Sequence, residues 1–419
     1  MDVVRRLVES RPDMWALETA SLGAPQKIND FIWCSPGVSN AYMLLAEGGR
    51  IVINTGMGFE APAHIANFAQ VCSGPTPYII LTQGHVDHVG GVSQFREPGT
   101  QVIAQRSNPD CQADDARIAA IRSQQSRVWF PRPTGMLTGK VALPPGVVQD
   151  RPTPDILFDD RYDLAFGGLR LELLSVPGGE TVDSLAVHLP DHGIVFTGNI
   201  FGPLFPHFPN LYTIRGDRYR FAEPYMTSLA RVRALEPEML ITGHFEPIVG
   251  RELIRTCLDR LEAAVDHVHR TTLAGLNAGK DIWTLMREIE LPDELYVGQG
   301  YGKVNWGVRS TWEACLGWFK GEHTSDLYAT PPHRIFPELV RLAGLGAVLD
   351  RGREKLAAGE LEEAMLLAEA ALESEPANAG ARSLARDVHQ RMLDRSDGLN
   401  FWEVGWLKHK IAALDGQAE

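Results

Sequence analysis

The chain has 419 residues, enough for roughly two or three domains of ordinary size. Hydrophobic residues make up 44% of it and charged residues 22%, which is typical of a folded globular protein and excludes a disordered one. The net charge of -13 argues against a nucleic-acid partner, because a phosphate backbone requires a basic surface. A small anionic ligand is still compatible with this charge, because a metal ion supplies positive potential locally.

The cysteines and the apolar runs indicate the compartment. Five cysteines are scattered along the chain without C-x-x-C spacing, which argues against a disulfide framework and against a thiolate zinc site. The first residues lack the apolar stretch of a signal peptide, and no apolar run approaches the roughly 20 residues that span a bilayer. We therefore expect a cytoplasmic protein with no membrane partner.

The first unit in chain order is rich in predicted strands. Apolar runs at 39–45 and 51–56 flank a Gly-Gly turn and predict a hairpin. Residues 61–72 have apolar side chains at helical spacing, and a short strand follows at 77–80. This strand, helix, strand order is typical of a layered α/β sandwich. Residues 106–165 are less periodic, and we expect a long excursion or a lid there.

The stretch LTQGHVDHVGG, at 81–91, has the donors of a metal site. Gln83 and His85 are two residues apart in an extended tail, so both side chains leave the same side of the backbone. Asp87 and His88 follow where the chain turns, and four oxygen or nitrogen donors can converge there. Such a set suits a divalent transition metal. The alternative is a turn in which the two histidines only form hydrogen bonds.

Further candidate ligands follow the ends of later predicted strands. Glu180 lies in the loop after the strand at 169–176, Asn199 follows the strand at 193–196, and His244 ends the strand at 239–244. Taken singly, Glu180 could be a solvated side chain and Asn199 a plain turn residue. That residues of these types recur downstream disfavours the interpretation of 81–91 as a turn in which the histidines only form hydrogen bonds.

These stretches resemble the metallo-β-lactamase superfamily. Residues 83–91 are similar to its H-x-H-x-D-H-x-G-G signature, with Gln83 where the first histidine belongs. Asn199 stands in a stretch similar to the F-T-G-D step, in place of an aspartate that bridges two metals. Asn54 likewise replaces an aspartate, and it either orients the metal loop or caps the next helix. The resemblance implies an α/β fold, the αββα sandwich, followed by an all-α C-terminal domain.

Three runs are similar to the alkylsulfatase branch of this superfamily. The loop at 177–181 looks like P-G-T-E-A-P, whose glutamate binds metal, and residues 317–321 resemble the G-W-Y-D-G that leads to a dimerisation domain. Residues 209–216 resemble N-L-x-T-L-R-G, which holds the sulfate; an arginine there pairs with an oxyanion in a bidentate manner, unless it is a surface residue. The expected substrate-binding side chains are Asn210, Thr213 and Arg215.

The resemblance also implies the domain organisation. Residues 1–280 would form the metallo-β-lactamase-like catalytic domain, and residues 281–419 a helical dimerisation domain of alkylsulfatase type. Helical periodicity at 342–357, 361–372, 378–392 and 402–414 agrees with this. We therefore expect a homodimer that forms through the C-terminal helices.

Carried over residue by residue, the resemblance implies two metal positions. The first position would have Gln83, His85 and Glu180, the second would have Asp87, His88 and His244, and Asn199 would lie near the bridging point. A glutamine amide is a weaker zinc ligand than imidazole, so either one ion binds tightly or two bind in a more electropositive cavity. The expected cofactor is one or two divalent ions, zinc first, with iron or manganese as alternatives.

The implied function is a metal-dependent hydrolase of a small anionic ester, a sulfuric ester hydrolase that uses a metal-bound hydroxide. Asp87 would act as ligand, as catalytic proton acceptor, or as both. Alternatives are a lactone, thioester or phosphoester hydrolase, an iron- or manganese-dependent redox enzyme on the same fold, and a non-catalytic binding protein. The chain ends at Glu419 without a further lipid-binding-like domain, so we expect a small substrate.

Overall fold

The structure is a computed structural model, and it describes residues 2–130, 147–211, 214, 216 and 220–416. By its internal contacts the chain divides into two compact units, Met1–Trp312 and Glu313–Glu419. The contacts do not test the expected domain boundary at residue 280, which stays a prediction. Within the described part of the chain, no helix combines the length and the apolar character that crossing a membrane requires.

The first unit contains two mixed sheets. In the first sheet the strands lie in sequence order, antiparallel up to β4 and parallel from β4 to β7. Its strands are β1 (Gln26–Lys27), β2 (Ile32–Ser35), β3 (Ala41–Ala46), β4 (Gly49–Ile53), β5 (Tyr78–Ile80), β6 (Gln101–Gln105) and β7 (Ile156–Phe158).

The second sheet has the order β13-β12-β11-β10-β9-β8, and in it only β11 and β12 are parallel. Its strands are β8 (Arg161–Phe166), β9 (Leu169–Ser175), β10 (Leu185–Leu189), β11 (Ile194–Gly198), β12 (Met239–Thr242) and β13 (Ile248–Val249).

Alternating side chains make the two sheets into a sandwich. On β3, Tyr42 and Leu44 join the core between the sheets, whereas Met43 points to the opposite face. On β11, Phe196 belongs to the same inner core and Val195 to the outer one. Tyr42 and Phe196 meet edge to face across the sandwich, with ring centroids 5.3 Å apart. The period of two residues therefore gives each sheet two apolar faces, and both need cover.

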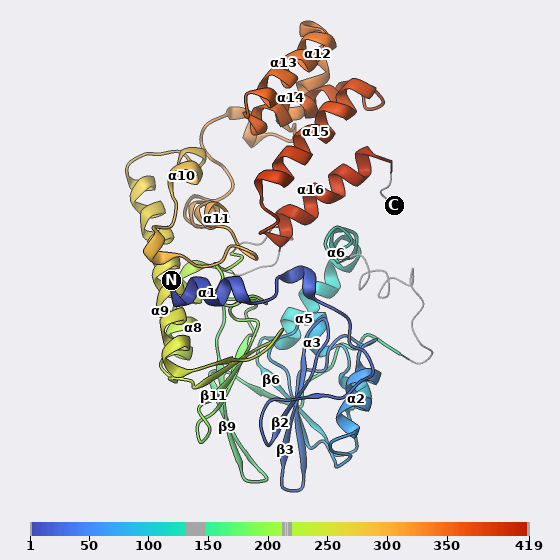
Figure 1. The fold of residues 1–419 in the computed structure, drawn as a ribbon, viewed down its shortest axis with the longest axis vertical. Coiled ribbons are helices and arrows are strands. Elements are labelled where there is room, and N and C mark those ends of the chain that lie inside the picture. The colour runs from blue at the N-terminus through green and yellow to red at the C-terminus, as the bar shows by residue number, and fades with distance from the viewer. Residues whose placement is uncertain (1, 131–146, 212–213, 215, 217–219, 417–419) are drawn as a thin grey trace. The chain divides into compact units, whose positions relative to one another are not determined.

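Helices provide that cover. Helices α2 (Ala61–Ala69) and α4 (Val92–Phe95) cover the first sheet, and α8 (Ala222–Arg233) and α9 (Arg251–Asn277) cover the second (Figure 1). The predicted αββα sandwich is confirmed. The other helices of this unit are α1 (Val3–Ser10), α3 (Val86–Val89), α5 (Asn108–Arg117), α6 (Ala119–Ser126), α10 (Ile282–Glu288) and α11 (Val304–Leu316), which continues into the second unit.

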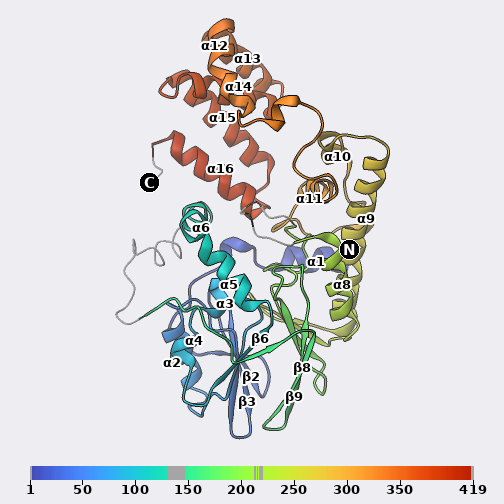
Figure 2. The same cartoon turned by 180° about the vertical axis from the view of Figure 1, so that it is seen from behind.

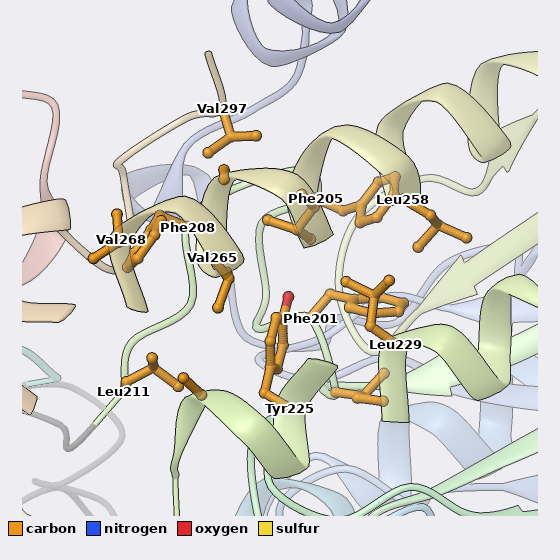
Figure 3. Close-up of a cluster of buried hydrophobic side chains, with 14 of the residues drawn as sticks. Phe201, Phe205, Phe208, Leu211, Tyr225, Leu229, Leu258, Val265, Val268 and Val297 are labelled. Atoms are coloured by element: carbon orange, nitrogen blue, oxygen red, sulfur yellow. The ribbon is translucent and has the colours of Figure 1, made fainter. Parts of the chain in front are cut away.

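The segment that follows β11 is anchored in the outer core beneath α8 and α9. Phe201, Phe205 and Phe208 are each about 1% exposed, and they pack with Tyr225 of α8 and Val265 of α9 (Figure 3). Phe201 meets Tyr225 edge to face, with ring centroids 6.3 Å apart. Burial of several aromatic rings is a large stabilising contribution, so the chain just after Asn199 has a fixed path.

Residues 106–165, expected to be an irregular excursion, contain the helices α5 and α6. Helix α5 buries only Asn108 and Gln112, and α6 buries no residue. Neither helix has an apolar stripe, so periodicity could not identify them. Both views place α5 beside α3 (Figures 1 and 2).

The second unit is helical, as expected. Neighbouring helices pack around a small core that includes Leu349, Ala368, Leu384 and Val388. Asn378 begins α15, because its side chain accepts the backbone N–H of Ala381. The helices are α12 (Phe336–Ala343), α13 (Leu345–Ala357), α14 (Leu361–Ser374), α15 (Ala379–Arg395) and α16 (Phe401–Leu414).

Candidate metal centre

The candidate ligands lie on loops that leave the same edge of the sandwich. Two backbone hydrogen bonds join the sheets at this edge, from Asn40 N–H to the Gly243 carbonyl (2.8 Å) and from Leu185 N–H to the Thr82 carbonyl (2.9 Å). The loops after β5, β9, β11 and β12 therefore start from fixed points. Ligands that are distant in sequence converge because these strand ends do.

Asn54 orients the loop that carries the motif. Its Oδ1 accepts the Thr82 backbone N–H at 2.9 Å, and its Nδ2 lies 3.0 Å from the Thr82 hydroxyl. Asn54 has φ 57, a left-handed conformation that asparagine tolerates better than most residues. Since Glu60 is the residue before α2, Asn54 does not cap that helix, and of its two predicted roles it orients the metal loop.

The second predicted position is assembled. Ligand atoms of Asp87, His88 and His244 lie within 4.8 Å of one another. Asn199 joins them, with its Nδ2 3.1 Å from His88 Nε2 and 3.0 Å from His244 Nε2. Asp87 Oδ2 lies 3.5 Å from His88 Nε2. Two imidazoles, a carboxylate and an amide oxygen make a ligand set that zinc accepts.

The first predicted position is also brought together, but its atoms contact protein groups. Gln83 Nε2 lies 3.1 Å from His85 Nδ1, and that nitrogen lies 3.5 Å from Glu180 Oε1. The same carboxylate oxygen accepts a hydrogen bond from Arg220 Nη2 at 3.0 Å. Arg220 is 1% exposed and Glu180 is 2% exposed, so this is a buried ion pair.

Both histidines of the second position are suited to metal binding. Burial lowers the pKa of His88 to about 4 and also holds the pKa of His244 below its usual value. Both imidazoles are therefore neutral near pH 7, as metal ligation requires. His88 Nδ1 lies 3.1 Å from the Ser39 hydroxyl, which leaves Nε2 facing Asn199 and His244.

Two buried amide oxygens support a cation at this edge. Gln83 Oε1 and Asn199 Oδ1 are inaccessible to solvent and have no hydrogen-bond partner among the described residues. A buried polar atom of this kind is costly unless an ion or a water satisfies it. A half-turn of either amide would direct its oxygen to the neighbouring imidazole nitrogens, because the two ends of an amide are nearly alike in shape. The residues present therefore fit a metal ion.

A cavity of about 830 Å³ opens onto the cluster. His85, Asp87, Glu180, Asn199 and His244 all line it. Its apolar wall includes Met14, Leu17, Met57, Phe130 and Tyr301, and the side chains of Arg122 and Arg151 line it as well.

Of the three predicted substrate-binding residues, the structure describes only Asn210. Asn210 is buried, its Nδ2 has no hydrogen-bond partner among the described residues, and it is not part of the cavity wall. Thr213 and Arg215 lie outside the described residues. Their role in binding the substrate stays a prediction. Sequence reasoning missed Ser39, Arg220 and the cavity arginines, because only the folded structure shows which polar residues are buried or face the cavity.

Comparison with known proteins identifies the family of the chain. Residues 34–244 match the family described as "Metallo-beta-lactamase superfamily", and residues 284–402 match "Alkyl sulfatase dimerisation". The chain is 26% identical over 405 residues to a linear primary-alkylsulfatase of Pseudomonas sp. (strain ATCC 19151), covering 90% of this chain and 74% of that protein. It is 23% identical over 421 residues to an (R)-specific secondary-alkylsulfatase of Pseudomonas sp., covering 91% and 62%.

A solved structure shares the fold. The stereoselective inverting sec-alkylsulfatase of Pseudomonas sp. superposes with a TM-score of 0.81 at 20% identity, over 94% of this chain and 66% of that one. This similarity covers both the sandwich and the helical unit. The chain therefore belongs to the metallo-β-lactamase superfamily, in an alkylsulfatase-like branch that has a dimerisation domain.

Proposed function

We propose that the protein is a metal-dependent hydrolase of sulfate esters. The observation that carries the proposal is the cluster of Asp87, His88 and His244 at the wall of a large cavity. The alkylsulfatases that the chain resembles support the sulfate ester as substrate. The apolar wall of the cavity supports an apolar alcohol as the other part of the ester.

The residues of the site have separate roles in this proposal. Asp87, His88 and His244 would hold a divalent ion, which we propose to be zinc, and the ion would supply Lewis-acid activation of water and of the ester oxygen. His88 and His244 hold the ion as neutral ligands. Asp87, whose side chain is 21% exposed, accepts a proton at the cavity wall. Arg151 offers positive charge to the sulfate at the cavity wall, whereas Arg122 lies 3.2 Å from Asp115, which also lines the cavity. The predicted sulfate-binding side chains Asn210, Thr213 and Arg215 belong to the same proposal.

The proposal includes the assembly and the compartment. A match to an alkyl sulfatase dimerisation family over residues 284–402 supports a homodimer through the helical unit. All five cysteines are free thiols, which supports a reducing compartment, the cytoplasm.

Sulfate release from alkyl sulfates of increasing chain length tests the function. We expect activity that chelation abolishes, that zinc restores, and that falls at least 100-fold in Asp87→Asn. The matched control is Asp191→Asn, which removes an exposed carboxylate in the turn between β10 and β11 and should leave activity unchanged. Sulfate release that persists without metal would contradict the proposal.

The oxygen donors of the first position favour a second candidate, an iron- or manganese-dependent redox enzyme. Gln83 and Glu180 supply an amide and a carboxylate there, beside a single imidazole from His85. Iron in the purified protein together with oxygen consumption would identify it. A lactone or thioester hydrolase would reveal itself by cleaving those esters faster than alkyl sulfates.

A further inference from the structure

We propose that the protein holds one resident metal ion per chain, at the second position, and that Gln83 and Arg220 keep the first position free of metal. This inference rests on the proposed metal-dependent function. It concerns how many ions the chain holds and where they bind, and it departs from the two-metal arrangement that the superfamily resemblance implies.

The second position has a full set of donors. Asp87, His88 and His244 place their ligand atoms within 4.8 Å of one another, and Asn199 lies 3.0 to 3.1 Å from both imidazole Nε2 atoms. Three protein ligands of these types and one open side are the usual composition of a catalytic zinc site. The open side faces the cavity, where Asp87 and His244 form part of the wall.

The predicted ligands of the first position are a neutral amide, an imidazole, and a carboxylate that is already paired with an arginine. Gln83, whose Nε2 lies 3.1 Å from His85 Nδ1, offers an ion only a neutral amide, which is a weaker ligand than an imidazole at that place. Arg220 donates to Glu180 Oε1, the carboxylate oxygen that faces His85. An ion could bind Glu180 at this oxygen only after the hydrogen bond from Arg220 had been broken.

The charges of the site also disfavour an ion at the first position. Two divalent ions have four positive charges, and of the predicted ligands only Asp87 and Glu180 are carboxylates. Arg220 already neutralises Glu180, and its side chain is 0% exposed, so water does not screen it. With Asn199 in place of an aspartate at the predicted bridging point, the predicted ligand set supplies no bridging carboxylate to offset the repulsion between two ions. A cation beside a buried guanidinium is strongly unfavourable in this interior.

Metal stoichiometry of the full-length protein tests the inference without reference to activity. The protein is loaded with zinc, dialysed against metal-free buffer and measured by inductively coupled plasma mass spectrometry. We expect one zinc per chain in the wild type and in His85→Ala, and less than 0.1 in His244→Ala. Two ions in the wild type would overturn the inference, and so would none, or an ion that His85→Ala loses and His244→Ala keeps.

Cobalt titration of the wild-type protein counts the bound ions independently. Visible absorbance of the wild-type protein should saturate at one equivalent of Co²⁺, and saturation at two equivalents would overturn the inference. The double variant Gln83→His with Asn199→Asp should bind a second ion, and adding Arg220→Met should tighten that second ion about 10-fold. If the wild type releases sulfate while it holds two ions, the function stands and this inference fails.

Discussion

Ser39 connects His88 to the strand end that presents His244. Its hydroxyl lies 3.1 Å from His88 Nδ1 and 3.3 Å from the carbonyl oxygen of Gly243. Because the hydroxyl hydrogen points to that carbonyl, the Ser39 oxygen accepts from His88 Nδ1–H. The lone pair of His88 is then on Nε2, the atom that faces the ligand cluster.

Replacing Ser39 by alanine should weaken metal binding and leave the fold intact. Without its hydrogen bond, the His88 ring loses its fixed tautomer and orientation, and we expect the zinc dissociation constant to rise about 10- to 100-fold. Competition with a chromophoric chelator measures it. Thr272→Ala is the matched control, since it removes a buried hydroxyl within α9. Equal zinc affinity in Ser39→Ala and wild type would refute this role.

Arg220→Met should destabilise the protein strongly, because it removes the buried guanidinium that offsets the charge of Glu180. We expect a loss of about 3–5 kcal/mol in the free energy of unfolding, measured by urea denaturation of the metal-free protein. Adding Glu180→Gln should recover a large part of it. Arg161→Met removes a half-exposed arginine paired with Asp163, and should cost no more than about 1 kcal/mol. Similar losses of stability in both single variants would show that the buried Arg220–Glu180 pair contributes no more than an exposed ion pair.

Gly243→Ala should disturb the cluster sterically. A Cβ atom there would lie 2.2 Å from Asn199 Oδ1 and 3.2 Å from His88 Cε1. We expect a loss of about 1–3 kcal/mol in stability, together with weaker zinc binding. At Gly346 a Cβ would meet nothing within 4 Å, so Gly346→Ala within α13 should be neutral or stabilising by about 1 kcal/mol. Unchanged zinc affinity in Gly243→Ala would argue against this packing.

Acid should weaken the fold through His64. This side chain is fully buried, with its Nδ1 2.8 Å from the Ser35 hydroxyl, and burial lowers its pKa to about 3. The unfolded chain takes up this proton near pH 6.5 and the folded chain only near pH 3. The unfolded state binds more protons in that window, so stability falls as the pH drops through it.

Between pH 7 and pH 5, His64 alone should cost about 2 kcal/mol. Urea denaturation at the two pH values should show a correspondingly smaller difference in His64→Gln than in the wild type. His333→Gln, which changes an exposed histidine, should keep the wild-type difference. The assignment fails if His64→Gln has the same pH dependence as the wild type.

The sequence predicted the parts of this protein that depend on local pattern. Alternating apolar residues gave the strands of the sandwich, and the short spacing from Gln83 to His88 placed their side chains together. His244 ends an apolar strand, and its resemblance to the last metal ligand of the superfamily identified it. In each case the evidence lies within a few neighbouring residues, where periodicity and spacing decide the geometry.

What depends on tertiary packing could not be predicted. Arg220 stands in the run RGDRYR, at 215–220, and nothing in this local sequence distinguishes it from the other arginines of the run. The structure shows that Arg220 is buried and paired with Glu180. Helices α5 and α6 have no apolar stripe, yet their side chains form much of the cavity wall. For Asn54 the sequence allowed two roles, and only the position of Thr82 chose between them.

The ligands of the second position come from both halves of the sandwich. Asp87 and His88 follow β5 of the first sheet, whereas Asn199 and His244 follow β11 and β12 of the second. An ion held by both sets acts as a cross-link at that edge, and its binding energy opposes separation of the two sheets. Removing the metal ion proposed for this site should therefore speed amide hydrogen exchange first at this edge of the sandwich, before the opposite ends of the strands.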